Sequence, residues 1–387
     1  MTVARGEHVG LLTIARSWGR IGCVGFGGPP AHIALLREQC VTVRGWLSDE
    51  EFSDAIAATN LLPGPASTQL AIWCAWRLRG WAGAVIGGLC FIVPGLVVIL
   101  ALAALFLVGH PPLWVLGAAG GAGAAVPAVA LNAARGLLSA SWARAGSALS
   151  RLRWYIYLAA GGLAGATAGS WLVLVLAACG LVELAIRGGG RPGHRASVIG
   201  APALASVTVG GLGAVAWVAF KVGALSYGGG FVIIPLMQHD AVNRYHWMSG
   251  SQFLTAVALG QVTPGPVVQT VAVVGYAAAG VAGGLLAATI AFAPSFGFIL
   301  GGGHLFHRLR SQTAAQAFLS GAGPAAIGAI AGAALPLARA LHYGWQGGVA
   351  AAAGVWLLLR PRSVPVALVG AAAVGVAAAL LGAPVGR

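Results

Sequence analysis

The residues best suited to chemistry in this chain belong to a short motif that occurs twice. The two copies are 201 positions apart, and they are Pro63-Gly64-Pro65 and Pro264-Gly265-Pro266. Each proline removes a backbone donor from a helix, and the glycine between two prolines allows a sharp bend. A helix that restarts after such a break exposes free N–H groups and the positive end of its dipole, which together bind anions. The motif therefore predicts two broken helices that bind an anion, although a lone kink could simply shape packing.

Polar side chains surround both breaks and could donate hydrogen bonds to a bound anion. Asn60 and Gln261 occupy equivalent positions just before the breaks. The candidate donors that follow the breaks are Ser67, Thr68, Gln69 and Gln269. Because two copies of the break occur in matching places of the chain, we favour binding over a purely structural kink.

Two cations occupy equivalent positions inside apolar stretches. Arg20 and Lys221 are 201 residues apart, and Lys221 is the single lysine of the chain. A cation within a membrane segment is costly and is usually functional. The pair could neutralise a dianion, whereas the alternative is that both side chains extend to the membrane surface.

A glycine-rich motif also occurs in both copies, as Gly25-Phe26-Gly27-Gly28-Pro29 and Ser226-Tyr227-Gly228-Gly229-Gly230. Glycines allow close approach of the backbone, either to a ligand or to a neighbouring helix. The candidate ligand contacts in these motifs are Gly27, Gly28, Gly228 and Gly229. No strand pattern precedes them, so a dinucleotide fingerprint is not credible.

The elements that position these residues must lie in a membrane. The chain has 387 residues, of which 58% are hydrophobic and 8% charged, with a mean hydropathy of +0.87. Soluble domains carry about 25% charged residues, so a soluble fold is excluded. We predict an all-α polytopic membrane protein in a lipid bilayer, with about ten to twelve helical segments. The net charge of +14 comes from arginines spread among the connections, as the positive-inside rule predicts, and it does not indicate nucleic-acid binding.

The chain is an internal duplication. Positions 20–66 align with positions 221–267 without a gap, and 14 of these 47 pairs are identical. The predicted organisation is an N-terminal repeat at 1–190, a linker at 191–200 and a C-terminal repeat at 201–387. The connection at 135–153 is rich in arginine whereas its counterpart near 339–345 is not, and the connections near 109–112 and 303–311 show the reverse. Opposite charge patterns predict an inverted repeat, which is a hallmark of secondary transporters.

Signals for catalysis are missing from the sequence. It contains no recognisable nucleophile–base arrangement, phosphate-binding loop or flavin motif, and its five cysteines have no metal-ligand spacing. We therefore predict no enzymatic activity, no cofactor and no metal.

The motifs in combination resemble one known family. They are 26–33, 62–65 with Gln69, 227–230 and 260–267, and they are similar to motifs of the chromate ion transporter family in its long, two-domain form. Tyr227 replaces the phenylalanine expected from Phe26. The resemblance covers both halves, and it implies a bacterial inner-membrane protein with antiparallel halves that exports chromate by secondary transport and confers chromate resistance.

Two alternatives to chromate export remain. Chromate is a tetrahedral dianion like sulfate, so the same scaffold could carry sulfate or another oxyanion. A membrane enzyme such as a chromate reductase would need a redox cofactor, for which no motif is present. The sequence also leaves the oligomeric state open, including a homodimer.

Overall fold

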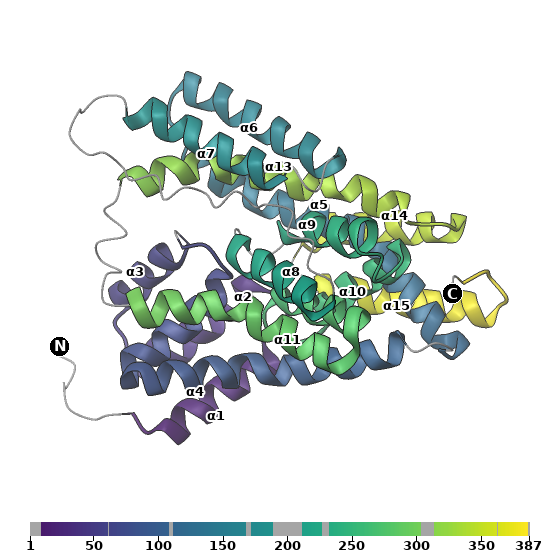
Figure 1. Ribbon diagram of the computed structural model, residues 1–387, viewed down its shortest axis with the longest axis horizontal. Helices are drawn as coiled ribbons and strands as arrows, with labels where there is room; N and C mark the ends of the chain where they lie inside the picture. The colour runs from purple at the N-terminus through teal and green to yellow at the C-terminus, as the bar shows by residue number, and fades with distance from the viewer. Residues whose placement is uncertain are drawn as a thin grey trace.

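The computed structural model describes residues 9–60, 62–107, 111–167, 172–188, 211–226, 232–302, 313–361 and 363–385. Every regular element in these ranges is a helix (Figure 1). The predicted linker at 191–200, the glycines Gly228 and Gly229, and the connection near 303–311 lie outside the described residues.

Equivalent helices follow one another in the two halves. The first half contains α1 (Leu11–Val24), α2 (Pro29–Arg37), η1 (Glu38–Val43), α3 (Asp49–Thr59), α4 (Ala66–Phe106), α5 (Leu113–Ala143), α6 (Ala148–Thr167) and α7 (Leu172–Gly188). The second half contains α8 (Gly211–Leu225), α9 (Ile233–Gln238), η2 (His239–Arg244), α10 (Gly250–Val262), η3 (Val267–Gln269), α11 (Thr270–Gly302), α13 (Thr313–Arg339), α14 (Gly344–Leu359) and α15 (Val364–Leu380). Four helical segments among the described residues are long and apolar enough to cross a membrane: Ala66–Phe106, Leu113–Ala143, Val267–Gly302 and Thr313–Arg339.

Each Pro-Gly-Pro motif forms the tip of a re-entrant helical hairpin. The Ser48 side chain caps α3 by accepting a hydrogen bond from the Glu51 N–H. With 11 residues, α3 is about 17 Å long and too short to cross the bilayer. Glu51, at the start of α3, pairs with Arg77 at 2.5 Å. If α3 and the start of α4 ran in one line, Glu51 and Arg77 would lie at opposite ends of that line. Their contact shows that the chain turns back at the break.

The sequence predicts a helix that is broken at this motif and restarts after it, and the structure adds that the second part runs back in the opposite direction. The chain turns sharply again at Arg79 and Gly80, where α4 leaves helical geometry. A Cβ atom added at Gly83 would lie 2.3 Å from the carbonyl oxygen of Ala75, so the part of α4 after the turn packs tightly against the part before it. The long second part of α4 then crosses the molecule.

The second half repeats this path closely. Its α11 turns at Ala279 and Gly280, and their φ and ψ angles match those of the first-half turn within 6°. The first helical turn after Pro266 is the 3-10 helix η3, whereas α4 begins with an α-helical turn. A 3-10 turn holds three residues instead of 3.6. Beyond the break, equivalent residues are 200 and not 201 positions apart, as Pro94 and Pro294 show, and the tighter turn matches this shift of one residue.

A second pair of hairpins is formed by α1 with α2 and η1 and by α8 with α9 and η2. The first hairpin bends at residues 25–29, and residues 227–231 of the second lie outside the described residues. In the first half, Gln39 on η1 donates to the Ser17 hydroxyl on α1 at 3.3 Å. In the second half, Lys221 on α8 pairs with Asp240 on η2 at 2.5 Å. Both contacts lie several residues away from the motif on each side, so the two arms of each hairpin run back along each other. The π-helical turns η1 and η2 occupy equivalent positions.

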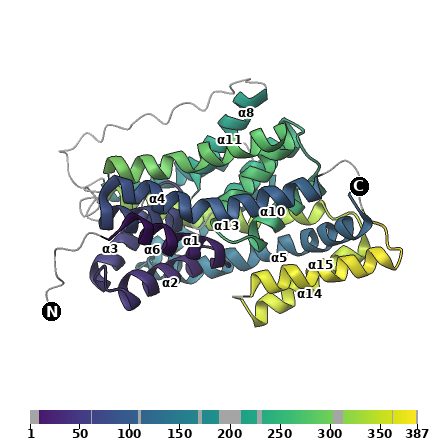
Figure 2. The same ribbon diagram turned by 90° about the horizontal axis from the view of Figure 1, so that it is seen from below.

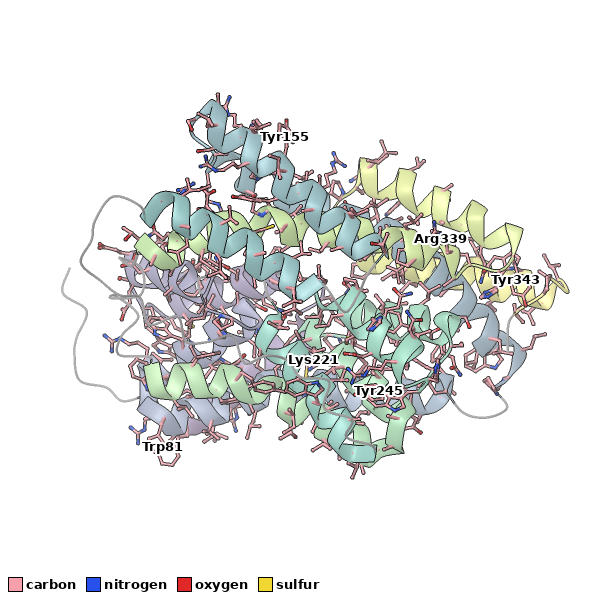
Figure 3. All side chains as sticks on the ribbon, turned by 45° about the horizontal axis from the view of Figure 1, so that its top comes forward. Trp81, Tyr155, Lys221, Tyr245, Arg339 and Tyr343 are labelled. Carbon is pink, nitrogen blue, oxygen red and sulfur yellow. The ribbon has the colours of Figure 1, made fainter. Side chains whose placement is uncertain are left out.

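Each half packs its last two helices against a long helix of the other half, and we call these four helices the exchanged helices. Helices α6 and α7 pack against α13 of the second half, and α14 and α15 pack against α5 of the first half. Helices α4 and α11 lie side by side along one side of the molecule (Figure 2). Tyr155, near the start of α6, lies toward the left of Figure 3, whereas Tyr343, which precedes α14, lies toward the right. Equivalent connections therefore lie at opposite ends of the molecule, as an inverted repeat requires.

Small residues allow these exchanged helices to touch backbone to backbone. A Cβ atom at Gly161 of α6 would lie 1.8 Å from the carbonyl oxygen of Ala325 on α13, and one at Gly328 would lie 1.9 Å from that of Leu158. Close helix pairs in membranes depend on this kind of contact.

Candidate functional site

The tips of the four hairpins meet between the two halves. The Gly64 N–H donates to the Ser226 carbonyl at 3.0 Å, and the Gly265 N–H donates to the Gly25 carbonyl at 3.0 Å. Each hydrogen bond joins the Pro-Gly-Pro tip of one half to the glycine-rich tip of the other half. Gly64 and Gly265 have φ values of +120° and +98°, which favour glycine. The two bonds are symmetric equivalents, so the breaks are joined at the interface of the repeats.

A cavity of about 290 Å³ lies beside the first break. Its walls come from the tip of the α3 hairpin, the C-terminal part of α5, and α13. The lining residues are Thr59, Asn60, Leu62, Gly64, Ala66, Leu137, Ala140, Arg144, Val232, Gly323, Ala326, Ile327 and Ile330. Mostly apolar walls with a few polar groups are typical of small-ligand sites, and this one ends at the start of the half-helix that follows the break.

The structure brings part of the predicted first-half site into this cavity. Asn60 and Gly64 line it, and Pro63 and Pro65 flank Gly64. The side chains predicted to follow the break, Ser67, Thr68 and Gln69, are buried beside the cavity and do not line it. The first turn of α4 therefore reaches the cavity through Ala66 and its backbone.

The predicted second-half residues are enclosed. Gln261 and Gln269 are buried, with Gln269 fully inaccessible. A Cβ atom at Gly95 of α4 would lie 2.1 Å from the Pro264 carbonyl oxygen, so α4 packs directly on the second break. Gly28, with a φ of +74°, lies near the Val267 side chain after this break, and Gly27 precedes it with a φ of +97°.

The two predicted cations lie away from the cavity lining. Arg20 is exposed on α1 and is not among the residues that line the cavity. Lys221 is buried, with 8% of its side chain exposed, and its ammonium pairs with the Asp240 carboxylate. The charge of Lys221 is therefore already balanced by a neighbour, and the structure does not bring Lys221 and Arg20 together at the breaks.

Arg144 is a cavity residue that the sequence did not single out. It follows the last turn of α5, is exposed, and has no carboxylate partner within the part of the chain that the structure describes. Sequence reasoning placed it among the arginines of a membrane connection. The available signal was its spacing from Leu137 and Ala140, because residues at i, i+3 and i+7 share one face of a helix.

His32 links the residues around the two breaks through hydrogen bonds. Its Nε2 lies 2.9 Å from the Gly25 carbonyl oxygen, and its Nδ1 lies 3.2 Å from the Ser67 hydroxyl. A carbonyl only accepts, so Nε2 carries the proton, and the Nδ1 of a neutral ring then accepts from Ser67. The Gly25 carbonyl also accepts from Gly265. The equivalent position in the second half is Ile233, so this link exists once.

Buried polar atoms without a hydrogen-bond partner gather around the breaks. Among the described residues they include Thr68 Oγ1, Gln69 Oε1, Ser226 Oγ, Gln261 Nε2, Gln269 Oε1 and Ser295 Oγ. Such atoms are uncommon in native proteins, and each calls for an explanation. These atoms retain the capacity to form hydrogen bonds at the breaks.

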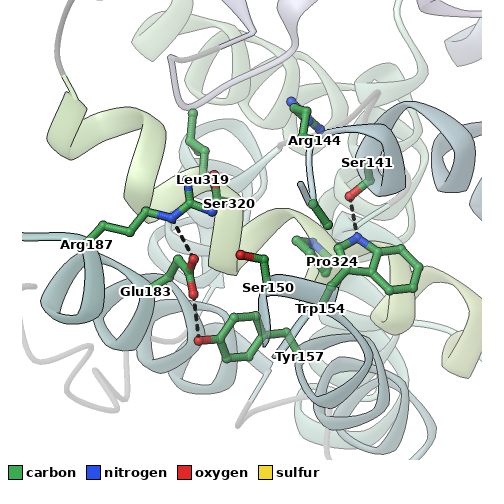
Figure 4. A pocket seen from close by; sticks show the side chains of 11 residues that line it. Ser141, Arg144, Ser150, Trp154, Tyr157, Glu183, Arg187, Leu319, Ser320 and Pro324 are labelled. Carbon is green, nitrogen blue, oxygen red and sulfur yellow. Dashed lines mark hydrogen bonds and ion pairs between the residues drawn. The ribbon is translucent and has the colours of Figure 1, made fainter. Parts of the chain in front are cut away.

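A second, much smaller cavity of about 20 Å³ lies beside the α6–α7 hairpin (Figure 4). Glu183 is nearly inaccessible there, and it accepts hydrogen bonds from Arg153, Arg187 and Tyr157. With its charge balanced, this cluster ties α6 to α7. Over the ranges that the structure describes, no three histidine, cysteine, aspartate or glutamate residues are grouped to hold a metal ion.

Comparisons with known proteins agree with the duplicated architecture. A family model described as "Chromate transporter" matches residues 12–184 and 213–378. The chain is 31% identical to a chromate transport protein of Cupriavidus metallidurans over 369 residues, which cover 93% of this chain and 91% of that relative. It is 29% identical to a probable chromate transport protein of Synechococcus elongatus, covering 92% and 93% of the two chains. A chromate transport protein of Pseudomonas aeruginosa is 31% identical, with 83% and 79% covered. No solved structure matches the chain.

These findings confirm the predicted resemblance, the two-half helical fold and a multi-pass membrane protein of bacterial type. The relatives are named as transport proteins, which agrees with a protein that is not an enzyme.

Proposed function

Because this chain belongs to the chromate transporter family, we propose that it is a secondary transporter that exports chromate across the bacterial inner membrane and thereby confers chromate resistance. The observation that carries this proposal is the cavity at the first break, into which the start of α4 opens. Substrate sites at broken helices between inverted repeats are a general feature of secondary transporters.

The charge distribution indicates the side to which the cavity opens. Arginines gather at the base of the α3 hairpin, at the α5–α6 connection and at the end of α7, and they are Arg77, Arg79, Arg144, Arg151, Arg153 and Arg187. Figure 1 shows α3 and the end of α7 at the same end of the molecule. The described connection between α13 and α14, at the opposite end, follows the single arginine Arg339. The positive-inside rule then makes the arginine-rich end cytoplasmic. Arg144 lines the cavity at that end, so a cytoplasmic anion would enter there.

The polar groups of the cavity suit a tetrahedral dianion. The free backbone N–H groups at the start of α4 offer donors and a positive dipole end. The Asn60 amide adds side-chain donors, and the Arg144 guanidinium adds a full charge at the mouth. Residues 264–269 and Gln261 of the second half would supply the equivalent groups once the site faces the other side. Sulfate has the same charge and shape, so it is the main alternative substrate.

The membrane potential could supply the driving force. Moving one charge across 100 mV changes the free energy by about 2.3 kcal/mol, so a dianion leaving a cell with a negative interior gains about 4.6 kcal/mol. Export of chromate without its counterions would therefore need no energy source other than the membrane potential.

Transport into inverted membrane vesicles tests the proposal. Vesicles from expressing cells should take up labelled chromate when energised, uptake should fall when the potential is collapsed, and excess sulfate should compete. Vesicles without the protein provide the control. Energised vesicles that take up labelled sulfate but no chromate would favour the alternative substrate, and uptake of neither would contradict oxyanion export.

Replacing Arg144 with glutamine should weaken chromate uptake by raising KM about tenfold, since a hydrogen bond to a charged group contributes about 1.5–3 kcal/mol and this one lies near water. Arg144→Lys should recover part of the loss. Arg135→Gln is the matched control, because Arg135 is exposed on the same helix but does not line the cavity. An equal effect of both glutamine variants on KM would show that only net charge matters.

A further inference from the structure

Two equivalent glutamines make different hydrogen bonds in the two halves. Gln69 and Gln269 each stand about one helical turn after a Pro-Gly-Pro break, and each amide lies beside the glycine of its own break. The Gln69 Nε2 donates to the Pro63 carbonyl at 2.7 Å, within its own hairpin. The Gln269 Nε2 instead donates to the Ile92 carbonyl on α4 of the other half, also at 2.7 Å. A glutamine bond to the crossing helix of the opposite half therefore exists at one break and not at the other.

The bond of Gln269 accompanies a closed second half. At this break, Gly95 brings the α4 backbone against the Pro264 carbonyl. Helix α10 packs on α5, and Gln261 at the end of α10 is only 8% exposed. Within the part of the chain that the structure describes, the polar groups of this break are therefore enclosed.

The equivalent region of the first half is open. Its Asn60, the counterpart of Gln261, is exposed, and the cavity separates α3 from α13. Ser295 of α11 occupies the position that corresponds to Gly95, and its hydroxyl lies near Gly64 without a hydrogen-bond partner. The carbonyl that corresponds to Ile92 belongs to Phe292, and Gln69 does not bond to it.

We propose that Gln69 and Gln269 are positioning residues of the transport cycle, which alternately fasten one break to the crossing helix of the opposite half. In an inverted repeat the halves exchange conformations when the site changes sides. The state open to the other side would then have Gln69 bonded to the Phe292 carbonyl and Gln269 folded back onto the Pro264 carbonyl. This inference rests on the proposed function only in assuming that the protein has two such states.

A hydrogen bond to the opposite half that is present at only one break changes the ratio of the two conformational states of the protein. One ordinary hydrogen bond contributes enough to shift a two-state equilibrium roughly 2- to 12-fold. Each glutamine keeps a bond within its own hairpin in one state, and only its bond to the opposite half fastens a break to the crossing helix. Loss of the Gln269 donor releases this fastening from the observed state and should favour the state open at the second break, whereas loss of the Gln69 donor releases it from the other state and should favour the observed one. The two variants should act in opposite directions, which a general loss of stability cannot produce.

Cysteine labelling can measure these directions without a substrate. The five native cysteines are first replaced, and a single cysteine is introduced as Asn60→Cys or Gln261→Cys. A membrane-impermeant maleimide is applied to inverted vesicles for position 60 and to right-side-out vesicles for position 261. Gln69→Met and Gln269→Met are the matched variants, because methionine keeps the side-chain length but has no N–H donor.

We expect Gln269→Met to accelerate labelling at position 261 and to slow labelling at position 60 by a few fold. Gln69→Met should slow labelling at position 261 further. Ser295→Gly, which gives the first break the residue found at the second, should slow labelling at position 60 and serves if a methionine variant does not fold. Unchanged labelling in folded variants, or shifts in the same direction for both glutamines, would overturn the proposal. Opposite shifts in a protein that does not transport chromate would support the proposal while refuting the substrate.

Discussion

Replacement of Lys221 with alanine should remove folded protein from the membrane, and loss of transport should follow from that loss of protein. The Lys221 ammonium and the Asp240 carboxylate lie 2.5 Å apart, with only 8% and 2% of their side chains exposed. Removing one member of a buried pair leaves an uncompensated charge, which costs about 3–5 kcal/mol. Thermal unfolding in detergent and the amount of protein in the membrane measure this effect.

A double variant separates the structural role of Lys221 from anion binding. Lys221→Met with Asp240→Leu removes both charges and fills similar volume, so it should recover most of the stability that Lys221→Ala loses. Arg20→Ala is the control at the equivalent position, and it should leave unfolding unchanged because Arg20 is exposed on α1. A stable Lys221→Ala protein that no longer takes up chromate would instead support direct binding of the anion by Lys221.

Replacement of Gly161 with alanine should destabilise the protein at the contact between the two halves. The added Cβ would lie 1.8 Å from the Ala325 carbonyl oxygen, and backbone cannot yield as the end of a side chain can. Helix α6 would have to move away from α13, where the exchanged helices join the two halves. Overpacking of this kind typically costs about 1–3 kcal/mol, and thermal unfolding in detergent would show it.

The neighbouring glycine provides the control for this change. A Cβ at Gly162 would meet nothing closer than 3.6 Å, an ordinary contact with the Gly328 carbonyl oxygen. Gly162→Ala should therefore leave stability unchanged or raise it slightly, since alanine favours helix by about 1 kcal/mol over glycine. Equal losses for Gly161→Ala and Gly162→Ala would contradict the close contact between α6 and α13.

The duplication made much of this fold predictable. Identical residues 201 positions apart located both breaks, and the structure caps the helices that lead to them with the equivalent residues Ser48 and Ser249. The direction of the chain after a break was not predictable. Apolar residues in a membrane helix do not reveal whether it continues or turns back, and the contact between Glu51 and Arg77 decides this only in three dimensions.

The candidate site was predictable only where the motif itself forms it. Asn60 and Gly64 line the cavity, and both belong to the break or lie within four residues of it in the sequence. Arg144 comes from a helix some 80 residues later, and no local pattern links it to the break. The difference between Gln69 and Gln269 also escapes sequence reasoning, since equivalent residues in a repeat are expected to make equivalent contacts.

The exchange of outer helices has a consequence for the order of synthesis. Helices α6 and α7 end at Gly188, whereas their packing partner α13 begins at Thr313, 125 residues later. At about 5–20 residues per second, the ribosome needs roughly 6–25 s to deliver that partner. During this interval the glycine faces of α6, including Gly161, have only lipid or the insertion machinery to contact. The first half therefore cannot complete its fold during translation before the second half arrives.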